Sequence, residues 1–350
     1  MNARIGLVVV SLLLSILIGL SLGRGHGDAS GDARGPARAT LTIGLSMDTL
    51  KEARWQGDRD TFVQRAQELG AKVLVLAANG DDTVQIGDVE KLITAGVDVL
   101  VIVPHDGKAM AKAVKLAHEA GIPVIAYDRL ILDADVDLYV SFDNLRVGEL
   151  QGQYLVEHLP APGRGRVVRI LGAKTDNNAG MLKSGQDRIL DPYVRSGSLK
   201  IVHEDWAEDW KPENAKRIVN AAITAQGGRF DAVLASNDGT AGGAIQALAE
   251  EGLAGQVMVT GQDAELVALQ RIAAGTQAMT IYKPLSLLAR GAAELAVRMA
   301  QRRPVIARRS VHNGAVEVPA VLFDPVTVSR ENIDATVVKD GVFHREDIYR

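Results

Sequence analysis

The sequence predicts an α/β protein made of two doubly wound lobes, each built on a parallel sheet. Three observations carry this prediction. Short apolar runs alternate with amphipathic helical patterns along most of the chain, and many of those runs are apolar on both strand faces. The length of 350 residues also exceeds that of one typical domain. Because parallel strands must be joined by crossovers, the intervening helices fit such sheets.

The first 39 residues differ from the rest of the chain. An apolar run at 5–22 follows the single cation Arg4, and a polar stretch rich in Gly, Asp and Arg separates it from the first strand. This pattern predicts an export signal or an uncleaved inner-membrane anchor, and the missing small-residue cleavage site leaves both open. The chain has no cysteine, which excludes a lipid-bearing cysteine, disulfides and thiolate metal sites. A periplasmic location is expected.

In the first half, the helical pattern at 54–69 places Phe62, Val63, Ala66 and Leu69 on one face, and Gly70 ends it. The same alternation then continues. Strands are predicted at 41–45, 72–77, 99–103, 124–126 and 136–142, and helices at 54–69, 84–94, 108–120 and 147–159.

A Pro-, Gly- and Arg-rich loop at 160–164 precedes a second series of units, and a lobe boundary is expected near Asn144. The second series has the same alternation but no obvious sequence repeat of the first. Its strands are predicted at 167–171, 200–205, 232–235, 257–260 and 277–281, and its helices at 179–190, 213–225, 240–250, 264–274 and 285–301.

Polar side chains follow the predicted strands in both halves. In open parallel sheets a ligand binds beyond the carboxyl ends of the strands, so these residues are candidates for a binding site. Helix capping is the competing interpretation for Asp48, Asn79 and Asp106, but it does not explain Arg129 or Lys283. The strand-end residues are Ser46, Met47, Asp48, Asn79, His105, Asp106, Asp128, Arg129, Asp143, Asn144, Asp176, Asn177, Asn178, Asn237, Asp238, Gln262, Asp263 and Lys283.

The mix of carboxylates, amides and cations suits a ligand with several hydroxyl groups, because each hydroxyl both donates and accepts hydrogen bonds. Sugars also present C–H faces that pack on aromatic rings. Trp55 and Trp210 are predicted near the same rim, where they can stack on a sugar or simply pack, whereas packing is the better interpretation of Trp206. The sugar candidates at the strand ends are Asp128, Arg129, Asn178, Asn237, Asp263 and Lys283.

Other functional classes find less support. The net charge of −4 argues against a nucleic-acid partner. No dinucleotide or phosphate-binding glycine motif opens a helix, and the seven histidines form no metal-binding pair, so neither a cofactor nor a metal is expected. A hydrolase needs an acid and a base flanking the bond, but most rim carboxylates neighbour Arg, Lys or Asn. A sugar-sensing transcription regulator would need a cytoplasmic location, which the apolar leader excludes. Binding without catalysis is therefore favoured.

Long stretches of the chain resemble the D-xylose-binding members of the type I periplasmic binding proteins of the ribose and galactose class. The resemblance covers nearly all of 41–345. The matching stretches are ARWQGDRDTFVQRAQELGAKV (53–73), GVDVLVIVPHDG (96–107), AYDRLILDADVDLYVSFDNLRVGELQ (126–151), DNNAG (176–180), DWKPENA (209–215), DAVLASNDGTAGGAIQAL (231–248), GQDAELVALQRIAAGTQAMTIYKP (261–284) and VVKDGVFH (337–344).

The resemblance implies a monomer that closes on D-xylose and docks on the membrane permease of an ABC importer. Two alternatives stay open: a membrane chemoreceptor or sensor as a further partner, and another pentose or hexose as the ligand. It also implies three crossings between lobes, near 142–144, 282–284 and 312–314. The lobes would then comprise 40–143 with 284–312, and 144–283 with 313–345. The implied sugar-binding residues are Arg54, Trp55, Asp128, Arg129, Asn178, Trp210, Asn237, Asp263 and Lys283.

Overall fold

The computed structural model describes residues 40–51 and 53–350. The predicted export or anchor segment at 5–22 and the polar stretch after it lie outside the described residues. Within the described part of the chain, no helix is both long and apolar enough to cross a membrane.

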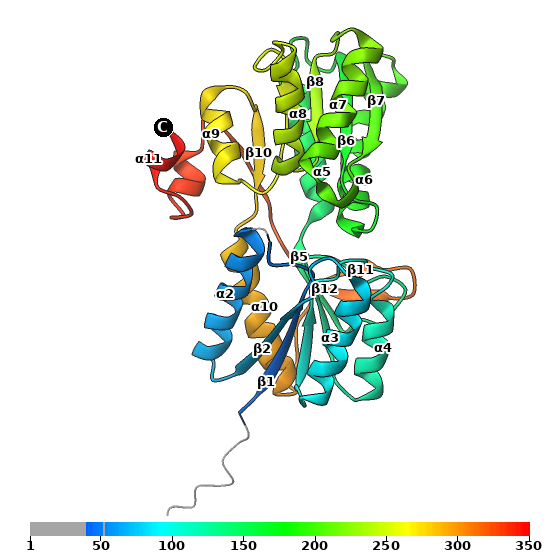
Figure 1. Ribbon diagram of the computed structural model, residues 1–350, viewed down its shortest axis with the longest axis vertical. Helices are drawn as coiled ribbons and strands as arrows, with labels where there is room; N and C mark the ends of the chain where they lie inside the picture. Colours follow the sequence, from blue (N-terminus) through cyan, green and yellow to red (C-terminus); the bar gives the residue numbers. More distant parts are fainter. Residues whose placement is uncertain (1–39, 52) are drawn as a thin grey trace, which may run out of the picture. The chain divides into compact units, whose positions relative to one another are not determined.

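The first lobe is built on a seven-stranded sheet in the order β11-β12-β5-β4-β3-β1-β2, with six parallel strands and β11 antiparallel at one edge. Helices α2 and α10 cover one face, and α3 and α4 cover the other (Figure 1). The strands are β1 (Thr42–Met47), β2 (Lys72–Ala77), β3 (Val99–Ile102), β4 (Val124–Tyr127), β5 (Leu138–Phe142), β11 (Arg309–His312) and β12 (Glu317–Phe323); the helices are α2 (Ala53–Glu68), α3 (Asp82–Thr94), α4 (Ala111–Glu119) and α10 (Leu285–Ala300).

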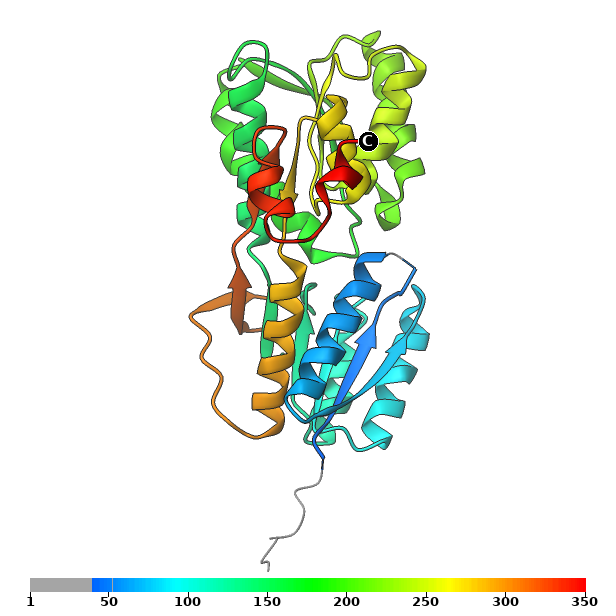
Figure 2. The ribbon, with the colours of Figure 1, turned by 90° about the vertical axis from the view of Figure 1, so that its left-hand side faces the viewer.

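The cores of this lobe explain why its strands read as continuous apolar runs. All four residues of β3 are buried, and alternate ones face opposite sides of the sheet. Val99 and Val101 pack with Phe62 of α2 and Leu288 of α10, whereas Leu100 and Ile102 pack against α3 and α4. In Figure 2, α10 lies beside α2 although the two helices are far apart in sequence.

The second lobe contains a four-stranded parallel sheet in the order β7-β6-β8-β9, with α5 and α6 packed on one face and α7 and α8 on the other. Its elements are β6 (Gly165–Leu171), β7 (Leu199–Trp206), β8 (Ala232–Ala235), β9 (Met258–Val259), α5 (Asn144–His158), α6 (Asn177–Arg195), η1 (Glu208–Trp210), α7 (Pro212–Gln226), α8 (Asp238–Glu250) and α9 (Leu266–Ala274). The prediction of two doubly wound parallel-sheet lobes is confirmed.

The expected strand at 277–281 forms as β10 (Met279–Tyr282), but it does not extend the four-stranded sheet. It pairs antiparallel with β13 (Val326–Ser329), a strand near the end of the chain. The chain closes with η2 (Asp334–Val338) and α11 (Arg345–Ile348), and Val337 and Ile348 pack with Leu269 and Ile272 of α9.

The expected crossing at 312–314 is wrong. His312 ends β11, and 313–314 lie in the tight connection to β12. The strands β11 and β12 pair antiparallel, and β12 in turn pairs in parallel with β5. The alternating apolar residues of Glu317–Phe323 complete the first sheet, so the chain leaves that sheet for the last time between Phe323 and Val326. The segment 313–323 therefore belongs with the first lobe.

The strand orders of the two sheets indicate where a ligand-binding site lies. In the first sheet the order reverses between β1 and β3, and in the second sheet it reverses between β6 and β8. At such a reversal, the connections leave the carboxyl ends of two neighbouring strands in opposite directions and leave a crevice between them. Asp48 and His105 follow β1 and β3, while Asp176 and Asn237 follow β6 and β8.

Candidate ligand-binding site

A cavity of about 370 Å³ lies where these strand ends meet. Its volume falls at the lower end of the roughly 300–1,000 Å³ found for small-molecule sites. All nine residues of the predicted set line it: Arg54, Trp55, Asp128, Arg129, Asn178, Trp210, Asn237, Asp263 and Lys283. The lining also includes Asp48, Thr49, Asn144, Asp176, Leu182, Asp209, Lys211, Pro212, Gly239, Gln262 and Glu265.

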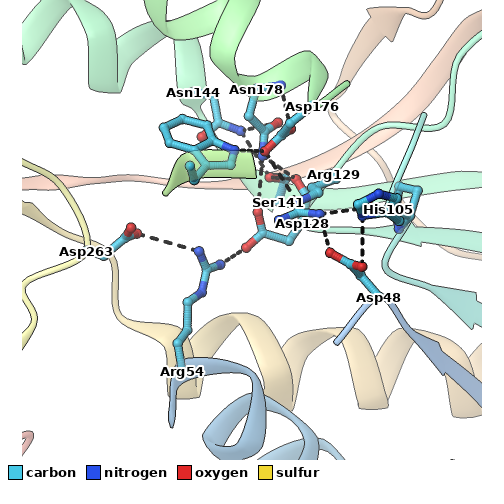
Figure 3. A network of polar contacts seen from close by, with 12 residues as sticks. Asp48, Arg54, His105, Asp128, Arg129, Ser141, Asn144, Asp176, Asn178 and Asp263 are labelled. Atoms are coloured by element: carbon cyan, nitrogen blue, oxygen red, sulfur yellow. Dashed lines mark hydrogen bonds and ion pairs between the residues drawn. The ribbon is translucent and has the colours of Figure 1, made fainter. Parts of the chain in front are cut away.

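Arg54, in the first turn of α2, connects carboxylates of the two lobes. Its guanidinium donates to Asp128 Oδ2, and its Nη1 lies 3.6 Å from Asp263 Oδ1 (Figure 3). Asp128 follows β4 with a left-handed backbone, φ 61°, and its carbonyl oxygen accepts hydrogen bonds from Tyr139 and Ser141. These bonds hold a conformation that few residues other than Gly, Asn and Asp adopt, so the fold fixes where the carboxylate points.

Arg129 is held by a second carboxylate of the first lobe. Its Nη1 donates to Asp48 Oδ2 at 2.8 Å, and His105 Nδ1 lies 3.0 Å from Asp48 Oδ1. Burial alone would raise the pKa of Asp48, but the His105 hydrogen bond and the Arg129 charge together lower it. The carboxylate is therefore ionised, and Asp48 is an ion-pair partner rather than a helix cap. Asp106, by contrast, does accept from the backbone N–H groups of Lys108 and Ala109.

Trp55 combines packing with exposure to the cavity. Its side chain is 5% exposed within the first-lobe core, and it also contributes to the cavity lining. The Cζ atoms of Arg54 and Arg129 lie 4.4 and 5.4 Å from its ring centroid, within cation–π distance. Packing and ligand contact are therefore compatible for this residue.

Asn178 comes from the first turn of α6 and reaches across to the first lobe. Its Nδ2 donates to the carbonyl and carboxylate oxygens of Asp128 at 3.1 and 3.2 Å, and its Oδ1 accepts from Asn144 Nδ2 at 2.9 Å. Asn237 instead caps α8, where it accepts from the Thr240 N–H. Helix capping and a place in the binding site are therefore compatible for Asn237, because it caps α8 and also lines the cavity.

Asp263 and Lys283 form the buried charge pair of the second lobe. Lys283 Nζ lies 2.8 Å from Asp263 Oδ1, and the side chains are 3% and 10% exposed. Burial acts to raise the pKa of Asp263, but the charges of Lys283 and Arg54 outweigh it and the pKa is lowered. Asp263 has φ 100°, so it is the second cavity carboxylate, after Asp128, whose backbone is left-handed.

Trp210 ends η1 with φ 58°, directly after Asp209 at φ 54°. Its indole lies on the backbone of Gly172, where an added β-carbon would overlap the ring. Its Nε1 donates to Asp176 Oδ2 at 3.2 Å. Trp206 is half-buried and does not line the cavity, and Lys174 Nζ lies 5.6 Å from its ring centroid. Enclosure of a sugar ring by Trp55 and Trp210 stays a prediction.

The implied set omitted eight polar residues that line the cavity, and four of them are strand-end residues: Asp48, Asn144, Asp176 and Gln262. Each follows a strand, so position alone marked them as candidates. What the sequence could not show is that Asp48 pairs with Arg129 and that Asn144 orients Asn178. Among residues 40–51 and 53–350, no cluster of three or more His, Cys, Asp or Glu residues could hold a metal ion.

Two parallel sheets whose strand ends converge on one cavity lined with paired charges define a two-lobed ligand-binding protein. The chain belongs to the family described as "Periplasmic binding protein domain", whose model matches residues 43–304.

Named relatives and solved structures are similar over most of their length. The chain is 50% identical over 304 residues to the D-xylose-binding periplasmic protein of Escherichia coli (strain K12), covering 87% of this chain and 91% of that one. It is 48% identical over 309 residues to the protein of the same name in Haemophilus influenzae, covering 88% and 92%. A carbohydrate transporter solute-binding protein of Chloroflexus aurantiacus, solved with D-glucose, matches with a TM-score of 0.80 and 34% identity, covering 88% and 97%.

Proposed function

We propose that this chain binds one monosaccharide, D-xylose, in the cavity between its lobes and delivers it unchanged to the membrane permease of an ABC importer. The protein acts in the periplasm as a monomer. Closure of the lobes around the sugar provides the signal that the permease recognises.

One observation carries this proposal. Asp128 and Arg129 of the first lobe line the same 370 Å³ cavity as Asp263 and Lys283 of the second. Carboxylates accept from sugar hydroxyls and cations donate to them, so charged groups on two sides can satisfy a small polyol completely. Asp128 is paired with Arg54, Arg129 with Asp48, and Asp263 with Lys283. Because these charges are already neutralised within the protein, a neutral ligand fits better than a charged one.

The charge state of the cavity favours binding over hydrolysis. A glycoside hydrolase needs one carboxylic acid whose pKa is raised so that it can protonate the leaving oxygen. Hydrogen bonding and nearby cations instead hold the pKa of both Asp48 and Asp263 below the usual range. These two groups are therefore acceptors for hydroxyl protons, not proton donors.

The choice of D-xylose draws support from the relatives at 50% and 48% identity that carry this sugar in their names. Calorimetric titration of the full chain with D-xylose, L-xylose, D-ribose and D-glucose tests it. We expect one site, with D-xylose binding most tightly and L-xylose serving as the mirror-image control. A higher affinity for another of these sugars would replace D-xylose, and no binding of any of them would overturn the proposal.

The same samples test for chemistry. NMR spectra of sugar recovered after long incubation should match those of the sugar added, because binding without catalysis leaves it unchanged. A thermal-denaturation series should also show a melting temperature that rises with sugar concentration, since a ligand at 100 times its Kd stabilises the native state by about 2.7 kcal/mol. A new product in the spectra would contradict the proposal.

A further inference from the structure

Asp176 lies in the loop between β6 and α6, and it contacts groups from both lobes (Figure 3). The residue is 6% exposed. Its Oδ1 accepts from the Asn178 N–H at 2.9 Å, which caps α6. Its Oδ2 accepts from Trp210 Nε1 at 3.2 Å and lies 3.3 Å from Arg129 Nε. One carboxylate thus contacts a helix end, an indole and a guanidinium.

Gly172, the backbone at 209–210 and Asp176 all position the Trp210 indole. Gly172 supports the ring from below, and the left-handed backbone at 209–210 sets where the side chain starts. Packing on Gly172 limits how far the ring can tilt, but it does not set the direction of the indole N–H. The hydrogen bond from Nε1 to Asp176 sets that direction.

Arg129 is oriented by carboxylates of both lobes. Asp48 of the first lobe accepts from its Nη1 at 2.8 Å, and Asp176 of the second lies 3.3 Å from its Nε. A guanidinium is planar and offers donors in a fixed fork, so contact at two of its nitrogens fixes its orientation. The Asp176 contact exists only while the two lobes lie close together around the cavity.

We infer that Asp176 is a positioning residue for the ligand, which fixes the Trp210 ring plane and ties it to Arg129 of the opposite lobe. The inference rests on the proposed function, because Trp210 and Arg129 are proposed sugar contacts. It makes the stacking surface and the cross-lobe ion pair dependent on one another, so that lobe closure and ring orientation occur together.

Asp176→Asn separates this role from helix capping. An asparagine keeps the size and one acceptor oxygen, and asparagine caps helices as well as aspartate does. That single oxygen cannot serve the Asn178 N–H, the Trp210 N–H and Arg129 together, and the amide N–H₂ adds a donor facing two donors. We expect an intact fold and a sugar affinity about tenfold weaker. Asp81→Asn is the matched control, because Asp81 caps α3 and does not line the cavity.

Two further readouts isolate the positioning role. In ¹⁵N-labelled protein, the indole N–H resonance of Trp210, identified by its loss in Trp210→Phe, should shift in Asp176→Asn and stay in place in Asp81→Asn. The affinity lost through Asp176→Asn should also shrink when Trp210 is already Phe, since that ring has no N–H to orient. An unmoved resonance, or equal losses with Trp and Phe at 210, would overturn the inference.

The resonance does not depend on which ligand binds. If the wild-type chain binds no sugar, the proposed function fails, while the shift or its absence still decides whether Asp176 orients the Trp210 ring.

Discussion

Adding one methyl group at Gly172 displaces Trp210, because the three atoms nearest to the new β-carbon all belong to the indole. A β-carbon at Gly172 would lie 2.5 Å from Cζ3 of the indole and closer still to Cη2 and Cζ2. Ordinary van der Waals contact begins at 3.4 Å, so the ring must retreat by at least about 0.9 Å. The hydrogen bond from Trp210 Nε1 to Asp176, now 3.2 Å, then stretches or breaks.

The expected cost in sugar affinity follows from the displaced ring. Stacking on an aromatic face is worth about 0.5–1.5 kcal/mol. The hydrogen bond to Asp176 joins two groups of the protein, so its loss weakens binding only through the orientation of the ring. Loss of the stacking contact gives about 0.5–1.5 kcal/mol, which is a Kd about 2 to 13 times higher. Calorimetry with the tightest-binding sugar of the panel measures it.

Two further variants show whether the methyl group acts through Trp210. In a Trp210→Ala background, Gly172→Ala should weaken binding little further, because the ring it displaces is gone. Gly180→Ala is the matched glycine control, since a β-carbon there meets no atom within 4 Å. Wild-type affinity in a folded Gly172→Ala protein would refute the proposed stacking role of Trp210.

Three other changes test the buried chemistry. Lys283→Met leaves the buried Asp263 carboxylate without its partner at 2.8 Å. Calorimetry should then show at least tenfold weaker sugar binding, and urea unfolding should show about 3 kcal/mol lower stability. Unchanged values would contradict the pairing. Burial raises the pKa of Asp238 from 3.8 to about 8, so the folded chain retains a proton that the unfolded chain releases. Between about pH 5 and pH 7.5, wild-type stability should fall by about 1.4 kcal/mol per pH unit relative to Asp238→Asn, and parallel stability curves would argue against that retained proton. Gly148→Ala places a methyl group on the carbonyl oxygen of Leu182 where α5 crosses α6, so it should cost about 1–3 kcal/mol of stability by urea unfolding; a neutral effect would mean that the helices can separate freely.

Much of the fold follows from patterns that are local in sequence. Strands such as β3 and β8 are apolar on both faces, and the amphipathic helices between them identify the crossovers of parallel sheets. The pairing of β12 with β5 was not predictable in this way, because about 180 residues separate them and the sequence of Glu317–Phe323 does not indicate which strand it pairs with. That long-range pairing is why the predicted third crossing fell too early in the chain.

The site could be predicted to a similar extent. Its residues follow strands, and the parallel topology brings strand ends together, so Asp128, Asn178 and Asp263 could be placed at one rim. Sequence position does not show which charges pair or how a side chain is turned. The roles of Asp48 and Asp176 depend on their contacts with Arg129, which follows a different strand from either of them. The positions of both aspartates after strands also fit helix capping.

A crystal structure of the full chain grown with D-xylose tests the central claim most directly. The account predicts the sugar in the 370 Å³ cavity, with hydroxyl groups hydrogen-bonded to Asp128 or Arg129 of the first lobe and to Asp263 or Lys283 of the second. The Trp210 ring should lie against a face of the sugar. A sugar held by one lobe alone, or bound outside the cavity, would contradict the account.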